Sequence, residues 1–192
     1  MKCWQGTLSL SGSGRIGEAA LSLDYANAVF DISATTGDDV VIYTLTGGSG
    51  SGNRFVLGSR RVNIIGGDFS GAFTGTGGVT KGSVTGISGG SLILRSNYEA
   101  SGDLILEDGL LEIPVNVHLG TFRQKANTTF SPTGSTFIDG NYYIDGNCKI
   151  QTKSTSTPAR ILLPTGSVVV AGGAKANIDV TSEGFTEDYI LI

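Results

Sequence analysis

The sequence predicts an all-β fold: an irregular single-stranded parallel β-helix, or β-solenoid, in which the chain coils and stacks short strands. The first observation is a tetrapeptide, Ile-Asp-Gly-Asn, that occurs twice within residues 138–147. The second is composition, because 30 glycines beside 39% apolar residues are typical of many turns joined by short buried strands. The third is a series of apolar segments that flank small turns at a loose spacing of roughly 15–24 residues, anchored at Val62, Val84, Leu104, Phe122, Phe137 and Ile161.

The doubled tetrapeptide indicates corners rather than hairpins. Asp139-Gly140 and Asp145-Gly146 each match the two-residue type I′ turn of a hairpin. Residues 141–144 between them are too few for a hairpin strand of normal length. We therefore interpret Gly140 and Gly146 as structural turns at the corners of a coil.

The isoleucines beside these corners predict a core. Ile138, Ile144 and Ile150 recur every six residues, so we expect each to enter the core after a corner and the three to form a stack. A β-sandwich or jelly roll is the alternative, because its turn signals also recur at close intervals.

Along the chain, we expect residues 1–46 to form an N-terminal cap or attachment region and residues 47–192 to form the β-helical region of one continuous domain. Within the first region, Gly17–Phe30 is rich in Ala and Leu and predicts a short helix that caps the open end of the solenoid. Val40–Leu45, VVIYTL, predicts a buried strand.

Two further segments have a distinctive composition. Gly47–Asn53, GGSGSGN, predicts a flexible loop. Tyr189–Ile192, YILI, is apolar, and we expect it to pair within the fold or at a subunit contact, since a free apolar segment is costly in water.

Charge and hydropathy bear on partners and location. The net charge is −4 and only 16% of residues are charged, so neither nucleic acid nor an anionic membrane is an expected partner. The first residues lack the apolar core of a signal peptide, and no apolar run reaches membrane-spanning length. For Cys3 and Cys148 two unpaired thiols are favoured, and one disulfide is the alternative.

Catalysis on sugars usually requires two carboxylates, and Asp139 with Asp145 is the pair of greatest interest. Equivalent corners of adjacent turns would place both on one side of the coil. Asp before Gly is also a preferred turn residue in its own right, which is the simpler explanation. Other carboxylates have no distinguishing context: Asp38, Asp39, Asp68, Asp103, Glu107, Asp108, Glu187 and Asp188. No catalytic residue is assigned.

Nucleophile, metal and dinucleotide chemistry find less support. His118 is the only histidine and lies in an alternating strand pattern, so we expect a packed or edge residue; no metal site and no cofactor are predicted. Gly12–Gly17 matches GxGxxG and Asp31 follows at the spacing of a ribose-binding carboxylate. A small dinucleotide-binding protein would also need further βαβ units, which the rest of the chain does not indicate.

Tyr142 and Tyr143 are adjacent, so on a strand they face opposite sides and at least one faces outward. Exposed tyrosine stacks on sugar rings and also serves protein contacts. We take these two tyrosines, with Asp139 and Asp145, as candidate ligand-binding residues.

Short apolar strands, Gly-containing corners and a Ser/Thr/Asn surface together resemble the β-helical tail spikes and fibres of bacteriophages. Phe55–Gly71, FVLGSRRVNIIGGDFSG, is similar to one coil of those proteins and of pectate-lyase-like β-helices. The resemblance implies a homotrimeric component at the virion surface or tail that binds a host glycan or other virion proteins. A glycan lyase or hydrolase on the same fold is the alternative, and the resemblance carries over no catalytic residue.

Overall fold

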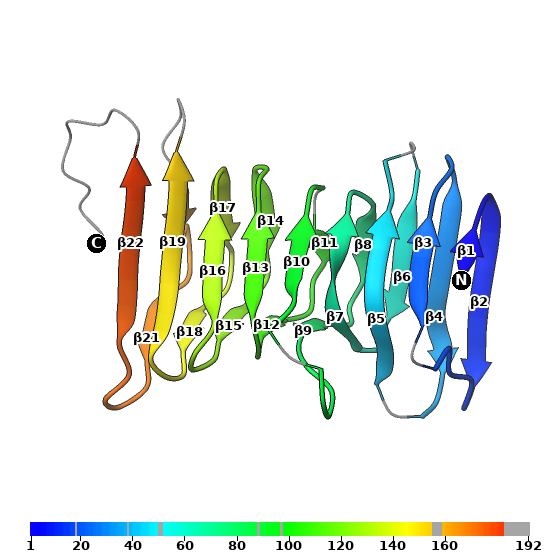
Figure 1. Ribbon diagram of the computed structural model, residues 1–192, viewed down its shortest axis with the longest axis horizontal. Coiled ribbons are helices and arrows are strands. Elements are labelled where there is room, and N and C mark those ends of the chain that lie inside the picture. The colour runs from blue at the N-terminus through cyan, green and yellow to red at the C-terminus, as the bar shows by residue number, and fades with distance from the viewer. Residues whose placement is uncertain are drawn as a thin grey trace.

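The structure is a computed structural model that describes residues 1–17, 19–37, 39–49, 52–87, 89–96, 98–154 and 159–182. The fold is all-β: a parallel β-solenoid of about seven turns. Figure 1 shows strands from successive coils stacked along the long axis, with β1 and β2 at one end and β21 and β22 at the other. Every pairing between named strands is parallel, which rules out the β-sandwich alternative.

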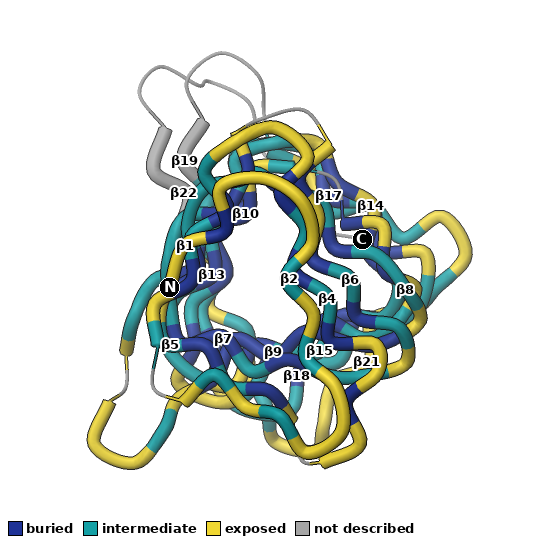
Figure 2. Tube along the Cα trace, turned by 90° about the vertical axis from the view of Figure 1, so that its right-hand side faces the viewer, coloured by how far each residue is buried: buried dark blue, intermediate teal, exposed yellow. Residues whose placement is uncertain are grey.

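Each coil has three sides, and Figure 2 shows the coils superimposed around one core. The first face contains β1 (Lys2–Cys3), β3 (Ala20–Leu23), β5 (Val40–Gly47), β7 (Val62–Phe69), β10 (Ser91–Leu94), β13 (Leu110–Ile113), β16 (Thr129–Pro132), β19 (Cys148–Ser154) and β22 (Ala176–Ser182). The second face contains the first halves of β5 and β7, then β9 (Val79–Lys81), β12 (Leu104–Leu106), β15 (Phe122–Gln124), β18 (Tyr142–Ile144) and β21 (Val168–Val170). The third face contains β2 (Gly6–Gly12), β4 (Ala28–Thr35), β6 (Arg54–Gly58), β8 (Ala72–Gly75) and β11 (Tyr98–Ala100), followed by β14 (Val117–Leu119), β17 (Ser135–Ile138) and β20 (Arg160–Leu162).

The segment 138–150 forms successive sides of one coil. Ile138 ends β17 on the third face, Ile144 ends β18 on the second, and Ile150 lies in β19 on the first; all are buried. The prediction that each enters the core beside a corner is therefore confirmed. The prediction that they stack on one another is wrong, because each aligns with a residue of a neighbouring coil, as Ile138 does with Leu119.

The glycines of the doubled tetrapeptide lie at corners, but the reason is proximity rather than turn type. Neither Gly140 nor Gly146 has a positive φ, so these corners are not type I′ turns. A Cβ on Gly140 would lie 2.6 Å from Thr121 Oγ1, and one on Gly146 would lie 2.6 Å from Ala126 Cβ. Glycine is required here because the preceding coil passes so close.

An aromatic column of four rings forms part of the core. Phe30, Phe55, Phe73 and Tyr98 follow one another along the third face, with ring centroids 5.1, 5.5 and 5.9 Å apart. Such ring pairs add about 0.5–1.5 kcal/mol each beyond the burial of their area. The column therefore ties four consecutive coils together.

The capping helix predicted over Gly17–Phe30 is wrong, and the described residues contain no helix. This segment instead supplies β3 and the start of β4, which alternate so that Leu21, Leu23 and Phe30 are fully buried. Burial of every second residue outweighs the modest helix propensity of Ala and Leu. Strands β1 to β5 thus already belong to the solenoid within the region expected to be a cap.

Val40–Leu45 lies in β5, as predicted. Cys3 and Cys148 are both free and buried, so the prediction of unpaired thiols is confirmed, and burial raises the pKa of the Cys148 thiol. Residues 50–51 of the predicted loop and all of Tyr189–Ile192 lie outside the described residues.

One charged side chain enters the core. Lys81 aligns with the inward-facing Ile64 and Leu106 and is fully buried. Its Nζ donates to the carbonyl oxygens of Gly82 (3.2 Å) and Asp108 (2.8 Å). Burial lowers the pKa of Lys81 below its ordinary 10.5, and the Asp108 carboxylate opposes this only in part.

We predict that Lys81 makes stability rise with pH in the alkaline range. Between the lowered folded-state pKa and 10.5, the unfolded chain binds more protons than the folded one, so the free energy of unfolding rises with pH. Urea unfolding from about pH 7 to pH 10 should show wild type gaining stability relative to K81M. K175M, which removes an exposed amine, is the control; a constant difference between wild type and K81M would contradict the prediction.

We also predict that Gly77→Ala destabilises the solenoid by about 1–3 kcal/mol, the usual cost of overpacking. A Cβ on Gly77 would overlap the Arg60 carbonyl oxygen of the preceding coil. Gly172→Ala is the matched control, since nothing lies within 4 Å of a Cβ there, and its effect should stay within about 0.5 kcal/mol. Equal denaturation midpoints for the two variants would refute the close-approach explanation.

Candidate functional site

The two predicted tyrosines lie on opposite sides of β18. Tyr142 is buried, its hydroxyl donates to Gln124 Oε1 at 2.5 Å, and burial raises its pKa well above the ordinary value. It therefore cannot serve as a surface contact in this conformation. Tyr143 faces outward, with the Arg123 guanidinium 4.2 Å from its ring centroid and Asn141 Nδ2 donating to its hydroxyl at 3.1 Å. One face of the Tyr143 ring is thus already covered by the neighbouring coil.

Asp145 is held in an ion-pair cluster. Its Oδ2 lies 2.7 Å from Arg123 Nη1 and 2.9 Å from Lys125 Nζ, both on the preceding coil. Desolvation alone would raise the pKa of Asp145, but the hydrogen bonds and charges of Lys125 and Arg123 outweigh it and lower the pKa. A carboxylate held in this way serves to join two coils.

Asp139 has a more exposed partner. Its Oδ2 lies 3.4 Å from His118 Nδ1, and both side chains are more than half exposed. The His118 ring stacks on Phe137 with centroids 4.5 Å apart, so the histidine is an exposed member of an outward column, in agreement with the packed or edge role expected for it.

Asp139 and Asp145 do not form a facing pair. The expectation that they occupy equivalent corners of adjacent turns is wrong, because they lie at two successive corners of one coil with β18 between them. Each is engaged with a different set of side chains. These separate contacts give no observation in favour of a paired acid and base.

The other carboxylates are distributed along the coils. Asp68 accepts from Arg95 Nε (2.6 Å) and Nη2 (2.8 Å), and Asp108 accepts from the Gly89 backbone amide at 2.6 Å. No three of the described His, Cys, Asp and Glu residues form a group that could hold a metal ion. Asp38, Glu187 and Asp188 lie outside the described part of the chain.

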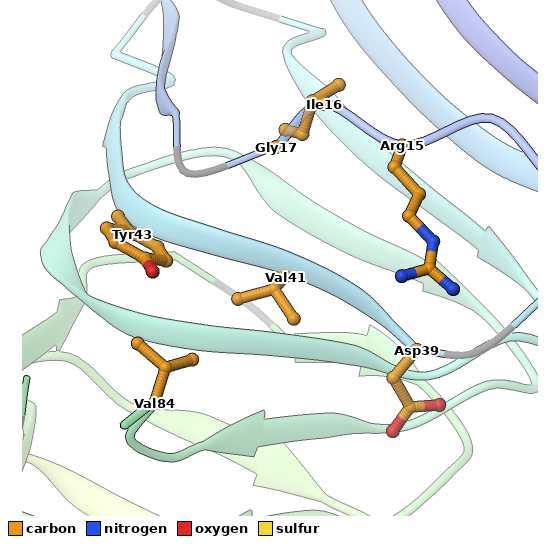
Figure 3. A pocket seen from close by; sticks show the side chains of 7 residues that line it. All are labelled: Arg15, Ile16, Gly17, Asp39, Val41, Tyr43 and Val84. Carbon is orange, nitrogen blue, oxygen red and sulfur yellow. The ribbon is translucent and has the colours of Figure 1, made fainter. Parts of the chain in front are cut away.

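A hollow of about 220 Å³ lies on the outer surface beside β5 (Figure 3). It forms because Val41 and Tyr43 face outward from β5, and two loops flank that strand, one after β2 and one after β9. The connection after β9 supplies Val84, which is fixed by backbone hydrogen bonds of 3.1 and 2.9 Å with Ile87. The lining residues are Arg15, Ile16, Gly17, Asp39, Val41, Tyr43 and Val84.

The hollow has two chemically different ends. In Figure 3, the Arg15 side chain extends toward Asp39 at one end, where the Asp39 carboxylate is directed away from the guanidinium, and the Tyr43 ring lies at the other end with Val41 between. Arginine only donates hydrogen bonds and an ionised carboxylate only accepts them. The arrangement therefore presents a donor and an acceptor beside an apolar wall.

The loop that carries Arg15 is the segment that matched GxGxxG. No helix follows Gly17 in the described chain; the next element is β3, so the helix N-terminus that would bind a pyrophosphate is missing there. Asp31 lies in β4, and its carboxylate accepts from the Ser33 backbone amide at 2.8 Å. The structural basis for a dinucleotide site is therefore absent from these residues.

Sequence reasoning missed the hollow because its residues come from three distant segments. Period-two alternation within VVIYTL could have placed Val41 and Tyr43 on the outer side. It could not show that the loops with Arg15 and Val84 flank them, since that depends on how many residues each coil contains.

Within the part of the chain that the structure describes, no helix is long and apolar enough to span a membrane. Comparisons with family models, with curated proteins and with solved structures found no match to this chain.

We predict that the two Asp residues of the doubled tetrapeptide differ in their contribution to stability. Asp145→Asn should lower the free energy of unfolding by about 1 kcal/mol at pH 7, at the upper end for partly exposed ion pairs, and Asp139→Asn by less. Because the folded-state pKa of Asp145 is depressed, its contribution is present above 3.8 and is lost as the pH falls through the lowered value.

Urea unfolding of both variants at pH 7 and at about pH 2.5 tests this difference. The gap between wild type and Asp145→Asn should narrow at the lower pH. Equal costs for the two variants at pH 7 would show that the cluster around Asp145 contributes no more to stability than the single contact of Asp139 with His118.

Proposed function

We propose that this protein is a structural or receptor-binding component of a virus particle, similar to a tail spike or fibre, at the virion surface or tail. In this proposal, its outer faces contact a host-surface glycan or neighbouring virion proteins. The β-solenoid fold supports it, together with the resemblance of Phe55–Gly71 to a coil of phage tail spikes. A homotrimer is part of the same proposal, because the resemblance implies one.

The observation that carries the proposal is that charged side chains on the outer faces form ion pairs between neighbouring coils. Acidic and basic side chains pair between neighbouring coils, as in Lys149–Asp179 at 2.7 Å and Arg95–Asp68 at 2.6 Å. Pairing of this kind leaves little net field over the faces. Hydroxyl, amide and backbone groups then remain to make hydrogen bonds, which suits an uncharged polar ligand such as a glycan.

An enzymatic function has no specific observation in its favour. Asp139 and Asp145 lie at separate corners, and among the described residues that line the hollow beside β5 only Asp39 carries a carboxylate.

Binding of the purified protein to immobilised bacterial capsular polysaccharides and lipopolysaccharides tests the receptor-binding role. We expect saturable binding to a subset of them, with affinity that changes less than threefold between about 50 and 500 mM NaCl, because net charge does not drive the contact. Light scattering should give a particle about three times the 19.8 kDa chain.

Two outcomes would oppose the proposal. Lack of binding to every polysaccharide and to intact cells would remove the receptor-binding role and leave only the scaffold role, which co-purification with virus particles would then have to show. Release of reducing sugar from a polysaccharide, abolished by an Asp→Asn variant, would replace the proposal with an enzyme.

A further inference from the structure

We propose that the hollow beside β5 binds one neutral pyranose residue, with the carbon face of the sugar against Tyr43 and its hydroxyls held by Arg15 and Asp39. This inference rests on the proposed function, since it names the class of glycan unit and the place where it is recognised.

Size limits the ligand to a single ring. The volume of about 220 Å³ is below the roughly 300–1,000 Å³ of sites for drug-sized molecules. The hollow lies on the outer surface of the solenoid, so the rest of a longer chain can extend into solvent. One sugar unit of a polysaccharide fits this description.

The walls select an amphipathic ring. Ile16, Val41 and Val84 supply aliphatic surface, and Tyr43 supplies an aromatic ring at one end (Figure 3). The C–H face of a pyranose is apolar and packs against such side chains, while its edge carries hydroxyls.

The charges select a neutral ligand. Among the described lining residues, Arg15 and Asp39 are the charged ones and lie at the same end of the hollow, so their opposite electrostatic potentials largely offset each other at a point midway between them. A hydroxyl can accept from the guanidinium, and its neighbour on the ring can donate to the carboxylate. Adjacent hydroxyls of a sugar supply this combination within one ring.

The wall formed by Val41 and Tyr43 is preorganised by the solenoid. Both lie in β5, which pairs with β3 on one side and β7 on the other. Val84 is held by its paired backbone hydrogen bonds with Ile87. Little conformational entropy is then lost when a ligand binds, which favours affinity from a small contact area.

The test uses nuclear magnetic resonance titration of the full chain with the methyl glycosides of glucose, galactose and mannose. We expect saturable amide shifts for at least one, concentrated at residues 15–17, 39–43 and 84, with a Kd of about 1–10 mM, as is typical of a single small contact. Tyr43→Ala and Asp39→Ala should each weaken binding at least fivefold. Asp39 is exposed at the rim, so its variant keeps the fold even where Tyr43→Ala disturbs packing.

Tyr25→Ala is the matched control. Tyr25 is also an exposed tyrosine, but it stacks on Trp4 with centroids 5.2 Å apart and lies outside the hollow. Its removal should leave the glycoside titration unchanged.

Three results would overturn the inference. The first is the absence of saturable shifts with any of the three glycosides at up to about 100 mM, an approximate practical limit for such weak ligands. The second is a set of shifts that remains unchanged in both Tyr43→Ala and Asp39→Ala. The third is tighter binding of adenosine or of methyl glucuronide, which would indicate a flat aromatic or an anionic ligand.

The same variants separate this inference from the proposed function. Polysaccharide binding that survives in Tyr43→Ala and Asp39→Ala would exclude the hollow while leaving the receptor-binding role in place. Glycoside binding at the hollow without binding of any polysaccharide would support the sugar site and oppose the receptor-binding role.

Discussion

The parallel stacking of successive coils is the constraint on which the rest of this structure depends. Neighbouring strands in such a stack lie about 4.8 Å apart, so each residue sits directly beside its counterpart in the next coil. Asn53, at a buried corner, shows how the fixed position of the neighbouring coil is used. Its Oδ1 accepts a hydrogen bond from the Ala28 amide at 3.0 Å, and its Nδ2 donates one to the Leu23 carbonyl at 3.1 Å. A polar side chain is tolerated in the interior because the neighbouring coil supplies both partners at fixed positions.

Stacking also means that the burial of each coil depends on its neighbours. Ile144 and Ile150 are buried, whereas Val170 and Ile178, which align with them one coil further on, are 52% and 41% exposed. These residues have the same inward direction and differ only in whether a described coil follows them. At this end of the described coils, an inward position is therefore much less buried than the same position one coil earlier.

The sequence predicted the architecture because its strongest signals are local. Alternation within short apolar segments and two corners six residues apart are sufficient to indicate a coil with brief sides, as Ile138 and Ile144 illustrate. Which residues lie over one another could not be predicted, since the offset changes from coil to coil. For this reason the sequence does not reveal the aromatic column from Phe30 to Tyr98. The helix predicted over Gly17–Phe30 is wrong for a related reason. Helix propensity can be read from the segment itself, whereas the neighbouring coil that buries Leu21 cannot.

Irregularity in coil length also determines where a site can form. A perfectly regular coil presents flat faces whose side chains are engaged with their neighbours, as Arg123, Tyr143 and Asp145 are. The hollow beside β5 occurs where this regularity fails, between the loop after β2 and the extra residues that follow β9. The stacked strands hold Val41 and Tyr43 in place. The loops add Arg15 and Val84, and Ile16 of the first loop also packs against the core. If the hollow binds a ligand as proposed, substitutions of Arg15 or Val84 would change the hollow while the strand pairing of the solenoid stays the same.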